Sequence, residues 1–212
     1  MHAVNTHFTS STPKAPRKPR NVRWRVVDIV VASVIGVASG LIFFAWNTAY
    51  VPLSAPLEPL LPGLQALLGG GWLFAGVLGG LIIRKPGAAI YTELVAAVVS
   101  TLIGNQWGPL TLASGLVQGV GAELVFALFL YANYRAYVAV LAGAGAGLAL
   151  AINDLLLWYP GSAAAFATIY TVSAVVSGAV IAGLLSWLAV RGIARTGALG
   201  RFASGREIRE DV

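Results

Sequence analysis

Six long apolar stretches dominate the 212-residue chain, and short segments rich in polar residues, glycine and proline separate them. A hydrocarbon core about 30 Å thick is crossed by roughly 20 apolar residues in a helix, because each residue rises 1.5 Å. The pattern therefore predicts six membrane-spanning helices. Their expected ranges are Val26–Trp46, Gly63–Ile83, Gly87–Ile103, Leu110–Tyr131, Ala136–Trp158 and Ala163–Val190.

The composition supports this interpretation. Hydrophobic residues make up 58% of the chain and charged residues only 10%, whereas about a quarter of a soluble domain is charged. We expect an all-α integral membrane protein with six transmembrane helices in one compact bundle. Residues 22–192 form this membrane domain, between a disordered basic cytoplasmic tail at 1–21 and a second cytoplasmic tail at 193–212.

Basic residues predict the orientation of the bundle. With six alternating spans, all fourteen Lys and Arg residues fall on one side of the membrane. The positive-inside rule then places both termini in the cytoplasm of a multi-pass cell-membrane protein. The net charge of +6 thus indicates topology and contact with anionic lipid in the bilayer, and no nucleic-acid partner is expected.

Several kinds of chemistry have no residues to support them. The chain has no cysteine, and its only histidines, His2 and His7, lie in the N-terminal tail. Disulfides, thiolate nucleophiles, zinc sites and Ser-His proteolysis are therefore excluded, and we expect no metal and no cofactor.

Small residues recur at helical spacing within the spans. Ala32, Gly36 and Gly40 share one face of the first helix, and three adjacent glycines interrupt the second span at 69–71. Small residues let membrane helices approach closely, so most of these positions should pack within the chain. The three adjacent glycines favour a helix break or a close backbone approach. The face of the first helix is the best candidate for docking a partner protein.

Two glutamates lie inside predicted spans without a basic residue at their depth. Glu93 and Glu123 must be protonated, face a water-filled cavity, or meet a cationic or hydrogen-bonding ligand. We expect both to contact a ligand. The other candidates in the outer half of the bundle are Gln118, Asn105, Trp107, Asp154 and Trp72. Carboxylates, amides and indoles without basic residues disfavour anionic solutes and suit a small, flat, cationic or amino-bearing heterocycle.

Two sequence motifs resemble a known family. They are Arg-Lys-Pro-Gly-Ala-Ala at 84–89, followed by Glu93, and Gln-Gly-Val-Gly-Ala-Glu at 118–123. Together with Gly104-Asn105, Gly108-Pro109 and the six-span layout, they resemble the YkoE-type substrate-binding (S) components of energy-coupling-factor (ECF) transporters. The resemblance extends over nearly the whole chain except the tails.

The resemblance implies a non-catalytic subunit that captures thiamin or its hydroxymethylpyrimidine precursor (HMP) from outside the cell. It also implies three partners, a membrane coupling protein and two ATPase subunits, which drive import by tilting the S component. The chain contains no Gly-x4-Gly-Lys-Ser/Thr loop for ATP. In such transporters the first helix often docks through Ala-x3-Ala, and Ala32, Gly36 and Gly40 are the corresponding residues here.

Other interpretations remain open at this point. The chain could be an S component for another heterocyclic vitamin. It could also be a stand-alone proton-coupled carrier in which Glu93 and Glu123 relay protons, and a carrier would still transport in cells that lack the ATPases. A membrane scaffold would leave the two unpaired carboxylates without a role.

Overall fold

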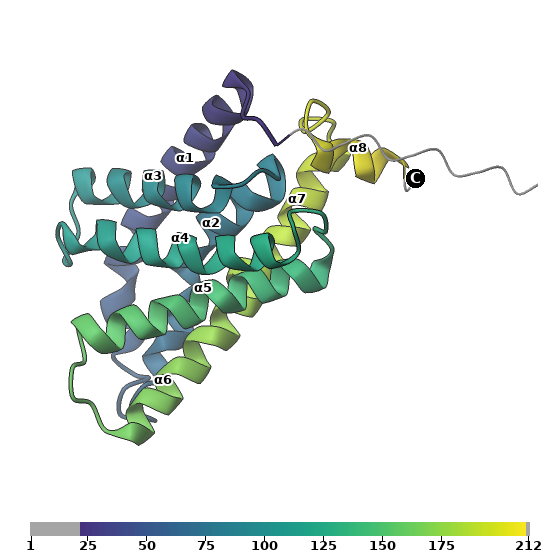
Figure 1. Ribbon diagram of the computed structural model, residues 1–212. Coiled ribbons are helices and arrows are strands. Elements are labelled where there is room, and N and C mark those ends of the chain that lie inside the picture. The colour runs from purple at the N-terminus through teal and green to yellow at the C-terminus, as the bar shows by residue number, and fades with distance from the viewer. Residues whose placement is uncertain (1–21, 211–212) are drawn as a thin grey trace, which may run out of the picture.

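The computed structural model describes residues 22–210, with side chains as far as Arg206, and this part of the chain is entirely helical (Figure 1). The predicted all-α class is therefore confirmed, while the predicted tail at 1–21 lies outside the described residues. In chain order the elements are α1 (Val26–Ser54), η1 (Leu64–Leu68), α2 (Gly70–Ile83), α3 (Ala88–Ile103), α4 (Leu110–Leu128), α5 (Ala136–Leu157), α6 (Ala164–Ser177), η2 (Gly178–Leu185), α7 (Ser186–Arg195) and α8 (Ala203–Glu210).

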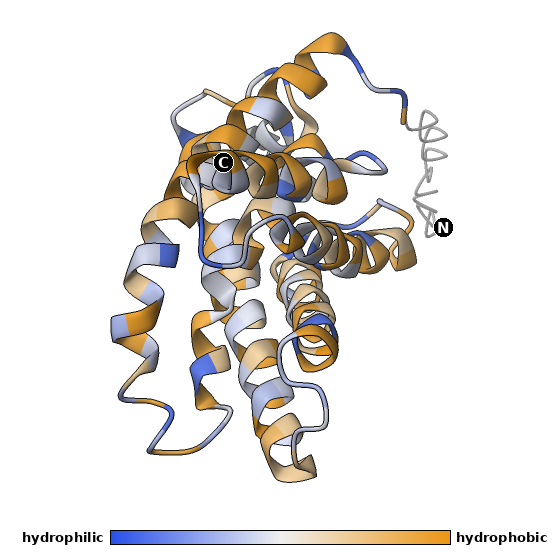
Figure 2. Cartoon of the chain, turned by 90° about the vertical axis from the view of Figure 1, so that its left-hand side faces the viewer, coloured by the Kyte–Doolittle hydropathy of each residue, from blue (hydrophilic) through white to orange (hydrophobic). Residues whose placement is uncertain are grey.

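Five helical segments are long and apolar enough to cross a membrane: Val26–Ser54, Leu64–Ile83, Leu110–Leu128, Ala136–Leu157 and Ala164–Arg195. The remaining predicted span, Gly87–Ile103, corresponds to α3, which has only 16 residues. At 1.5 Å per residue it is about 24 Å long, less than the bilayer core of about 30 Å. Figure 2 shows apolar residues along the helices and hydrophilic residues concentrated toward the connections.

Two of the predicted spans need correction. The first helix continues past Trp46 to Ser54, with Pro52 inside it. Proline removes one backbone hydrogen bond, and this close to the helix end the loss is tolerated. The second span is not a single α-helix, since it begins as the 3-10 helix η1 and becomes α2 after Gly69.

The glycines at 69–71 produce both effects that the sequence predicted. They separate η1 from α2, and they allow close contact with neighbouring elements. A Cβ at Gly71 would lie 2.2 Å from the indole nitrogen of Trp46, and one at Gly70 would lie 2.6 Å from Ser177 Oγ. Only glycine therefore fits these positions.

The α2 helix is the centre of the bundle. It contacts α1, α3, α4, α5, η2, α7 and α8. Away from α2, close contacts at glycines join α5 to η2 and α4 to α5. A Cβ at Gly143 on α5 would lie 2.1 Å from the carbonyl oxygen of Gly178 in η2, and one at Gly121 on α4 would lie 2.5 Å from the carbonyl oxygen of Gly145 on α5. The backbones of these helices thus touch directly.

The predicted C-terminal tail is partly structured. The α7 helix ends at Arg195, and α8 follows at 203–210. Ser204 is fully buried, and its hydroxyl donates a hydrogen bond to the carbonyl oxygen of Ile82 at the end of α2 (3.2 Å). This segment therefore packs on the bundle at the end that carries the basic residues.

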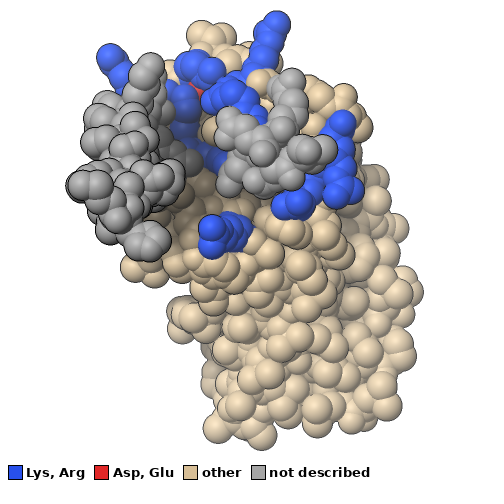
Figure 3. All heavy atoms as spheres, turned by 90° about the vertical axis from the view of Figure 1, so that its right-hand side faces the viewer, with Lys and Arg blue, Asp and Glu red and all other residues tan. Residues whose placement is uncertain are grey.

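Lys and Arg gather at that one end of the molecule (Figure 3). Asp28 is fully buried there and pairs with both Arg25 (2.7 Å) and Lys85 (2.5 Å). The hydrogen bond from Arg25 to Asp28 raises the pKa of the guanidinium. Because Lys85 belongs to the α2–α3 turn, the ion pair ties the start of α1 to that turn.

Candidate functional site

A cavity of about 310 Å³ lies toward the other end of the bundle. This volume is at the small end of the range for ligand sites, roughly 300–1,000 Å³. The cavity is lined by the C-terminal part of α1, by η1 and the start of α2, by the middle and C-terminal part of α3, by the first half of α4, by the end of α5 and by α6. Its walls are Phe43, Asn47, Tyr50, Gln65, Ala66, Gly69, Trp72, Glu93, Ala97, Ser100, Trp107, Thr111, Ser114, Gly115, Gln118, Leu150, Asp154, Trp158, Tyr159 and Tyr170.

Glu93 is the acidic side chain that α3 contributes to the wall of the cavity. It is 1% exposed, and its Oε2 accepts a hydrogen bond from the backbone amide of Gly76 (2.6 Å). Its other oxygen, Oε1, is buried and has no hydrogen-bond partner. A buried carboxylate oxygen without a partner is costly. Glu93 therefore brings to the cavity wall an acceptor whose hydrogen-bonding capacity the described residues leave unused.

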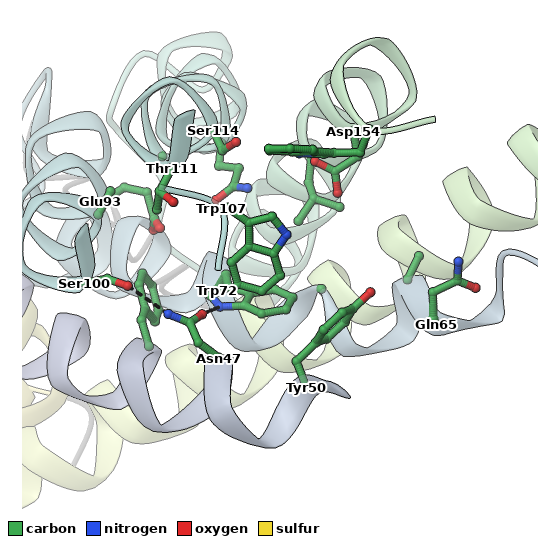
Figure 4. Close-up of a pocket in the computed structure, with 18 of the residues that line it drawn as sticks. Asn47, Tyr50, Gln65, Trp72, Glu93, Ser100, Trp107, Thr111, Ser114 and Asp154 are labelled. Atoms are coloured by element: carbon green, nitrogen blue, oxygen red, sulfur yellow. Dashed lines mark hydrogen bonds between the residues drawn. The ribbon is translucent and has the colours of Figure 1, made fainter. Parts of the chain in front are cut away.

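Three aromatic rings form a cluster at the cavity. The ring centroids of Trp72 and Trp107 are 5.2 Å apart with an interplanar angle of 86°, and Tyr50 lies 5.1 Å from Trp72 and 5.7 Å from Trp107. Edge-to-face packing of this kind leaves ring faces free to contact a flat or cationic ligand. In Figure 4 the two indoles lie between Glu93 and Asp154.

Hydrogen bonds hold the aromatic cluster in place. The indole N–H of Trp72 donates to Asn47 Oδ1 (2.7 Å), and the amide nitrogen of Asn47 donates to Ser100 Oγ (3.0 Å). The three side chains come from α2, α1 and α3, so the network ties these helices together on the wall of the cavity (Figure 4).

A second carboxylate, Asp154, lies at the opposite wall. It accepts hydrogen bonds from the hydroxyl of Tyr170 (2.6 Å) and from the side-chain amide of Asn153 (3.0 Å). Tyr159 packs against Tyr170 with a centroid distance of 5.3 Å. This wall thus combines a negative charge with aromatic rings, while the residues lining the cavity include no Lys, Arg or His. The arrangement favours a cationic group and disfavours an anion.

The structure brings five of the seven predicted ligand residues together on this cavity: Glu93, Gln118, Trp107, Asp154 and Trp72. Asn105 is not on the wall. Its Oδ1 accepts hydrogen bonds from the backbone amides of Trp107 and Gly108 (both 2.9 Å) and from the hydroxyl of Thr111 (3.0 Å). Asn105 therefore organises the α3–α4 loop that carries Trp107.

Glu123 also lies outside the cavity. Its Oε1 accepts a hydrogen bond from the amide of Gly87 (2.6 Å) and its Oε2 one from the amide of Ala89 (2.9 Å). The carboxylate thus caps the N-terminus of α3, where the helix dipole favours negative charge. Burial and a hydrogen bond to Glu123 raise the pKa of Tyr131 to about 12.

The predicted docking residues of α1 are covered in this structure. Ala32, Gly36 and Gly40 are buried, and a Cβ at Gly36 or Gly40 would lie 2.6 Å from the side chain of Val95 or Val99 on α3. They serve the intramolecular contact between α1 and α3 rather than a free surface. The exposed face of α1 carries larger apolar residues instead, including Val30, Val34 and Leu41.

Sequence reasoning missed several wall residues, among them Tyr50, Gln65, Ser100, Ser114 and Tyr170. Helical spacing could have found two of them. Ser100 lies seven residues after Glu93 and Ser114 four residues before Gln118, so each shares a helix face with a predicted residue. Trp158 and Tyr159, which follow directly after α5, also line the cavity. Tyr50 and Tyr170 reach it only through the packing of distant helices.

Comparisons with known proteins agree with this fold. Residues 27–149 match the family model for the permease component of the ABC-type cobalt transport system. A crystal structure of an S component of an ECF transporter has a TM-score of 0.77 and 32% sequence identity, covering 89% of this chain and 95% of that one. The fold and its ligand-sized cavity therefore define an ECF-transporter S component, a non-catalytic membrane subunit that binds substrate.

A relative in sequence shows which family of S components the chain belongs to. The chain is 34% identical over 188 residues to YkoE of Bacillus subtilis (strain 168), covering 88% of this chain and 93% of the relative. The name of that relative carries a provisional assignment as an HMP/thiamine permease. This chain belongs to the YkoE family of S components, as its two motifs predicted.

Proposed function

We propose that this S component captures thiamin or HMP at the cavity between α1 and α6. The observation that carries the proposal is the buried Glu93 Oε1, which has no partner and belongs to the wall of an aromatic cavity. The exocyclic amine of an aminopyrimidine is a hydrogen-bond donor of the kind this oxygen lacks. The provisional HMP/thiamine assignment of the YkoE relative supports the same substrate class.

The walls suggest how the two rings of thiamin would be placed. The aminopyrimidine would donate to Glu93 and stack among Tyr50, Trp72 and Trp107. The thiazolium cation would then face Asp154 and its tyrosines, where a carboxylate and ring faces stabilise positive charge. HMP would fill only the Glu93 side of the cavity.

The basic residues favour an orientation with the cavity toward the outside. Lys and Arg gather at the end of the bundle away from the cavity, and the positive-inside rule assigns that end to the cytoplasm. The α3 helix would then complete a six-helix topology in spite of its short length. Import would depend on a membrane coupling protein and two ATPase subunits, with the S component tilting to deliver its ligand.

Calorimetric titration of the detergent-purified chain with thiamin and with HMP tests the substrate. We expect saturable binding of at least one of them, and a loss of about a hundredfold in affinity for Glu93→Gln, within the range for leaving one buried polar group unpaired. The variant Arg201→Gln removes an exposed charge outside the cavity and should bind like the wild type. A folded wild-type chain that binds neither ligand would refute the substrate assignment, and the search would turn to other heterocycles.

A further inference from the structure

The two motifs that distinguish this sequence meet in space away from the cavity. Glu123 ends the Gln-Gly-Val-Gly-Ala-Glu motif on α4, and both of its oxygens accept hydrogen bonds from backbone amides of the Arg-Lys-Pro-Gly-Ala-Ala motif, at Gly87 and Ala89. The side chain is 7% exposed. Glu123 is thus a buried carboxylate that ligand binding does not use directly.

The α3 helix depends on this contact because it lacks an N-terminal cap of its own. Its N-cap is Gly87, which has no side chain and a φ of 84°, and its first turn contains no acidic residue. The first amides of a helix have no intrahelical acceptors. Glu123 supplies two acceptors from another helix, in a charge-assisted geometry that is stronger than a neutral cap.

From this cap, α3 and α4 run along a seam of small residues toward the cavity. Gly115, Gly119 and Glu123 follow one another at intervals of four on α4. A Cβ at Gly119 would lie 3.2 Å from Glu93 Cβ and 2.9 Å from Ile90 Cα, and one at Gly115 would lie 2.6 Å from Ala97 Cβ. The face of α3 that carries Glu93 therefore packs directly on the glycines of α4.

A seam of glycine and alanine allows close approach but has few side chains that interlock. On the α4 side, α3 therefore relies on a directional contact at the end of the seam to restrict sliding, whereas on its α1 side Val95 and Val99 pack against Gly36 and Gly40. Glu93 lies one helical turn after Ala89, on the same face. A slip of about 1 Å would lengthen its 2.6 Å hydrogen bond to Gly76 beyond the normal range.

We propose that Glu123 is a positioning residue for Glu93: by holding the N-terminus of α3 it fixes the register at which Glu93 presents its unpartnered oxygen to the cavity. Glu123 itself does not touch the ligand. The effect on ligand affinity rests on the proposed function, whereas the effect on the position of Glu93 does not. The two parts can therefore be tested separately.

The ligand-free test uses the amide proton of Gly76, which donates to Glu93 Oε2. In NMR spectra of the glycine-labelled chain in detergent, Glu93→Gln should move the Gly76 resonance upfield, because the short hydrogen bond to the carboxyl oxygen is replaced by a weaker one to an amide oxygen. Glu123→Gln should move it in the same direction, whereas Arg201→Gln should leave it in place. A Gly76 resonance that Glu123→Gln does not move would overturn the proposal, whatever the ligand.

The ligand-binding test is a double-mutant cycle with HMP and thiamin as the titrants. Glu123→Gln should weaken binding by about tenfold in the wild-type background and have little effect in the Glu93→Gln background, because contacting networks are not additive. Equal effects in both backgrounds would assign Glu123 a purely structural role and overturn the proposal. If the wild type binds neither ligand, the substrate assignment fails and the Gly76 resonance still decides the positioning role.

A second variant covers the case in which Glu123→Gln does not fold. Glu123→Asp keeps the charge but is one methylene shorter, so it can reach at most one of the two amides. It should shift the Gly76 resonance in the same direction by a smaller amount. A folded Glu123→Asp with an unshifted Gly76 resonance would count against the proposal in the same way.

Discussion

At the scale of single residues, the two acidic side chains of the cavity differ in how completely their oxygens are hydrogen-bonded. Asp154 is satisfied by Tyr170 and Asn153, so it contributes negative charge rather than an open acceptor. Glu93 has one satisfied oxygen and one without a partner. Under the proposed function, a ligand would gain a directional hydrogen bond at Glu93 and an electrostatic attraction at Asp154.

The aromatic cluster gives a prediction at this scale. Trp107→Ala removes one ring from the Tyr50–Trp72–Trp107 cluster and should weaken HMP and thiamin binding by about tenfold to a hundredfold. That range corresponds to roughly 1–3 kcal/mol for the stacking of a base on an aromatic ring. Calorimetry checks it, with a thermal melt to establish that the variant folds. Unchanged affinity for both ligands would show that the pyrimidine does not stack on this ring.

At the scale of elements, the bundle depends on helices that meet backbone to backbone. Gly143 on α5 faces the carbonyl oxygen of Gly178, and a Cβ at Gly143 would lie only 2.1 Å from that oxygen. Gly178 begins η2, a π-helical stretch between α6 and α7. The wider turns of this stretch occur where the chain passes α5, and glycine is the residue that both sides of the crossing can accommodate.

A side chain at this crossing should therefore be destabilising. Gly143→Val forces the backbones of α5 and η2 apart and should cost at least about 1–3 kcal/mol, the usual range for overpacking. The readout is the midpoint of thermal unfolding in detergent. Gly192→Ala on α7 is the matched control, since nothing lies within 4 Å of its Cβ position, and alanine there should leave the midpoint unchanged or raise it slightly. Equal midpoints for Gly143→Val and wild type would contradict the packing described here.

At the scale of the whole molecule, charge and cavity lie toward opposite ends. The segment before α1, the α2–α3 turn, the α4–α5 turn, and α7 with the segment after it carry the basic residues. The helix ends around the cavity carry aromatic and amide side chains (Figures 3 and 4). A bundle with this polarity crosses a bilayer in one orientation far more favourably than in the other.

The orientation can be measured because the chain contains no cysteine. A single cysteine at exposed Ala163, between α5 and α6, should react with a membrane-impermeant maleimide in intact cells. A single cysteine at exposed Thr196, after α7, should react only after the cells are opened. The reverse pattern would show the opposite orientation. Reaction at both sites in intact cells would contradict a membrane crossing between Ala163 and Thr196.

The sequence by itself determined the all-helical class, the approximate helix positions and the family, and it singled out five residues that the structure places on one cavity. These follow from local pattern, since apolar length predicts a span and a polar group inside a span predicts a site. The same local logic ended α1 too early, since the helix continues past Trp46 to Ser54. It placed α3 correctly, although α3 is shorter than the other apolar helices.

Only the tertiary structure decided what each small or acidic residue contacts. Glu93 and Glu123 are equivalent in sequence terms, both buried and both without a basic neighbour at their depth. Their helices are rotated so that Glu93 lies on the cavity while Glu123 lies against the start of α3. Likewise Gly36 faces α3 instead of an open surface. Helix rotation and register depend on contacts between residues far apart in the chain, and no pattern within one helix contains that information.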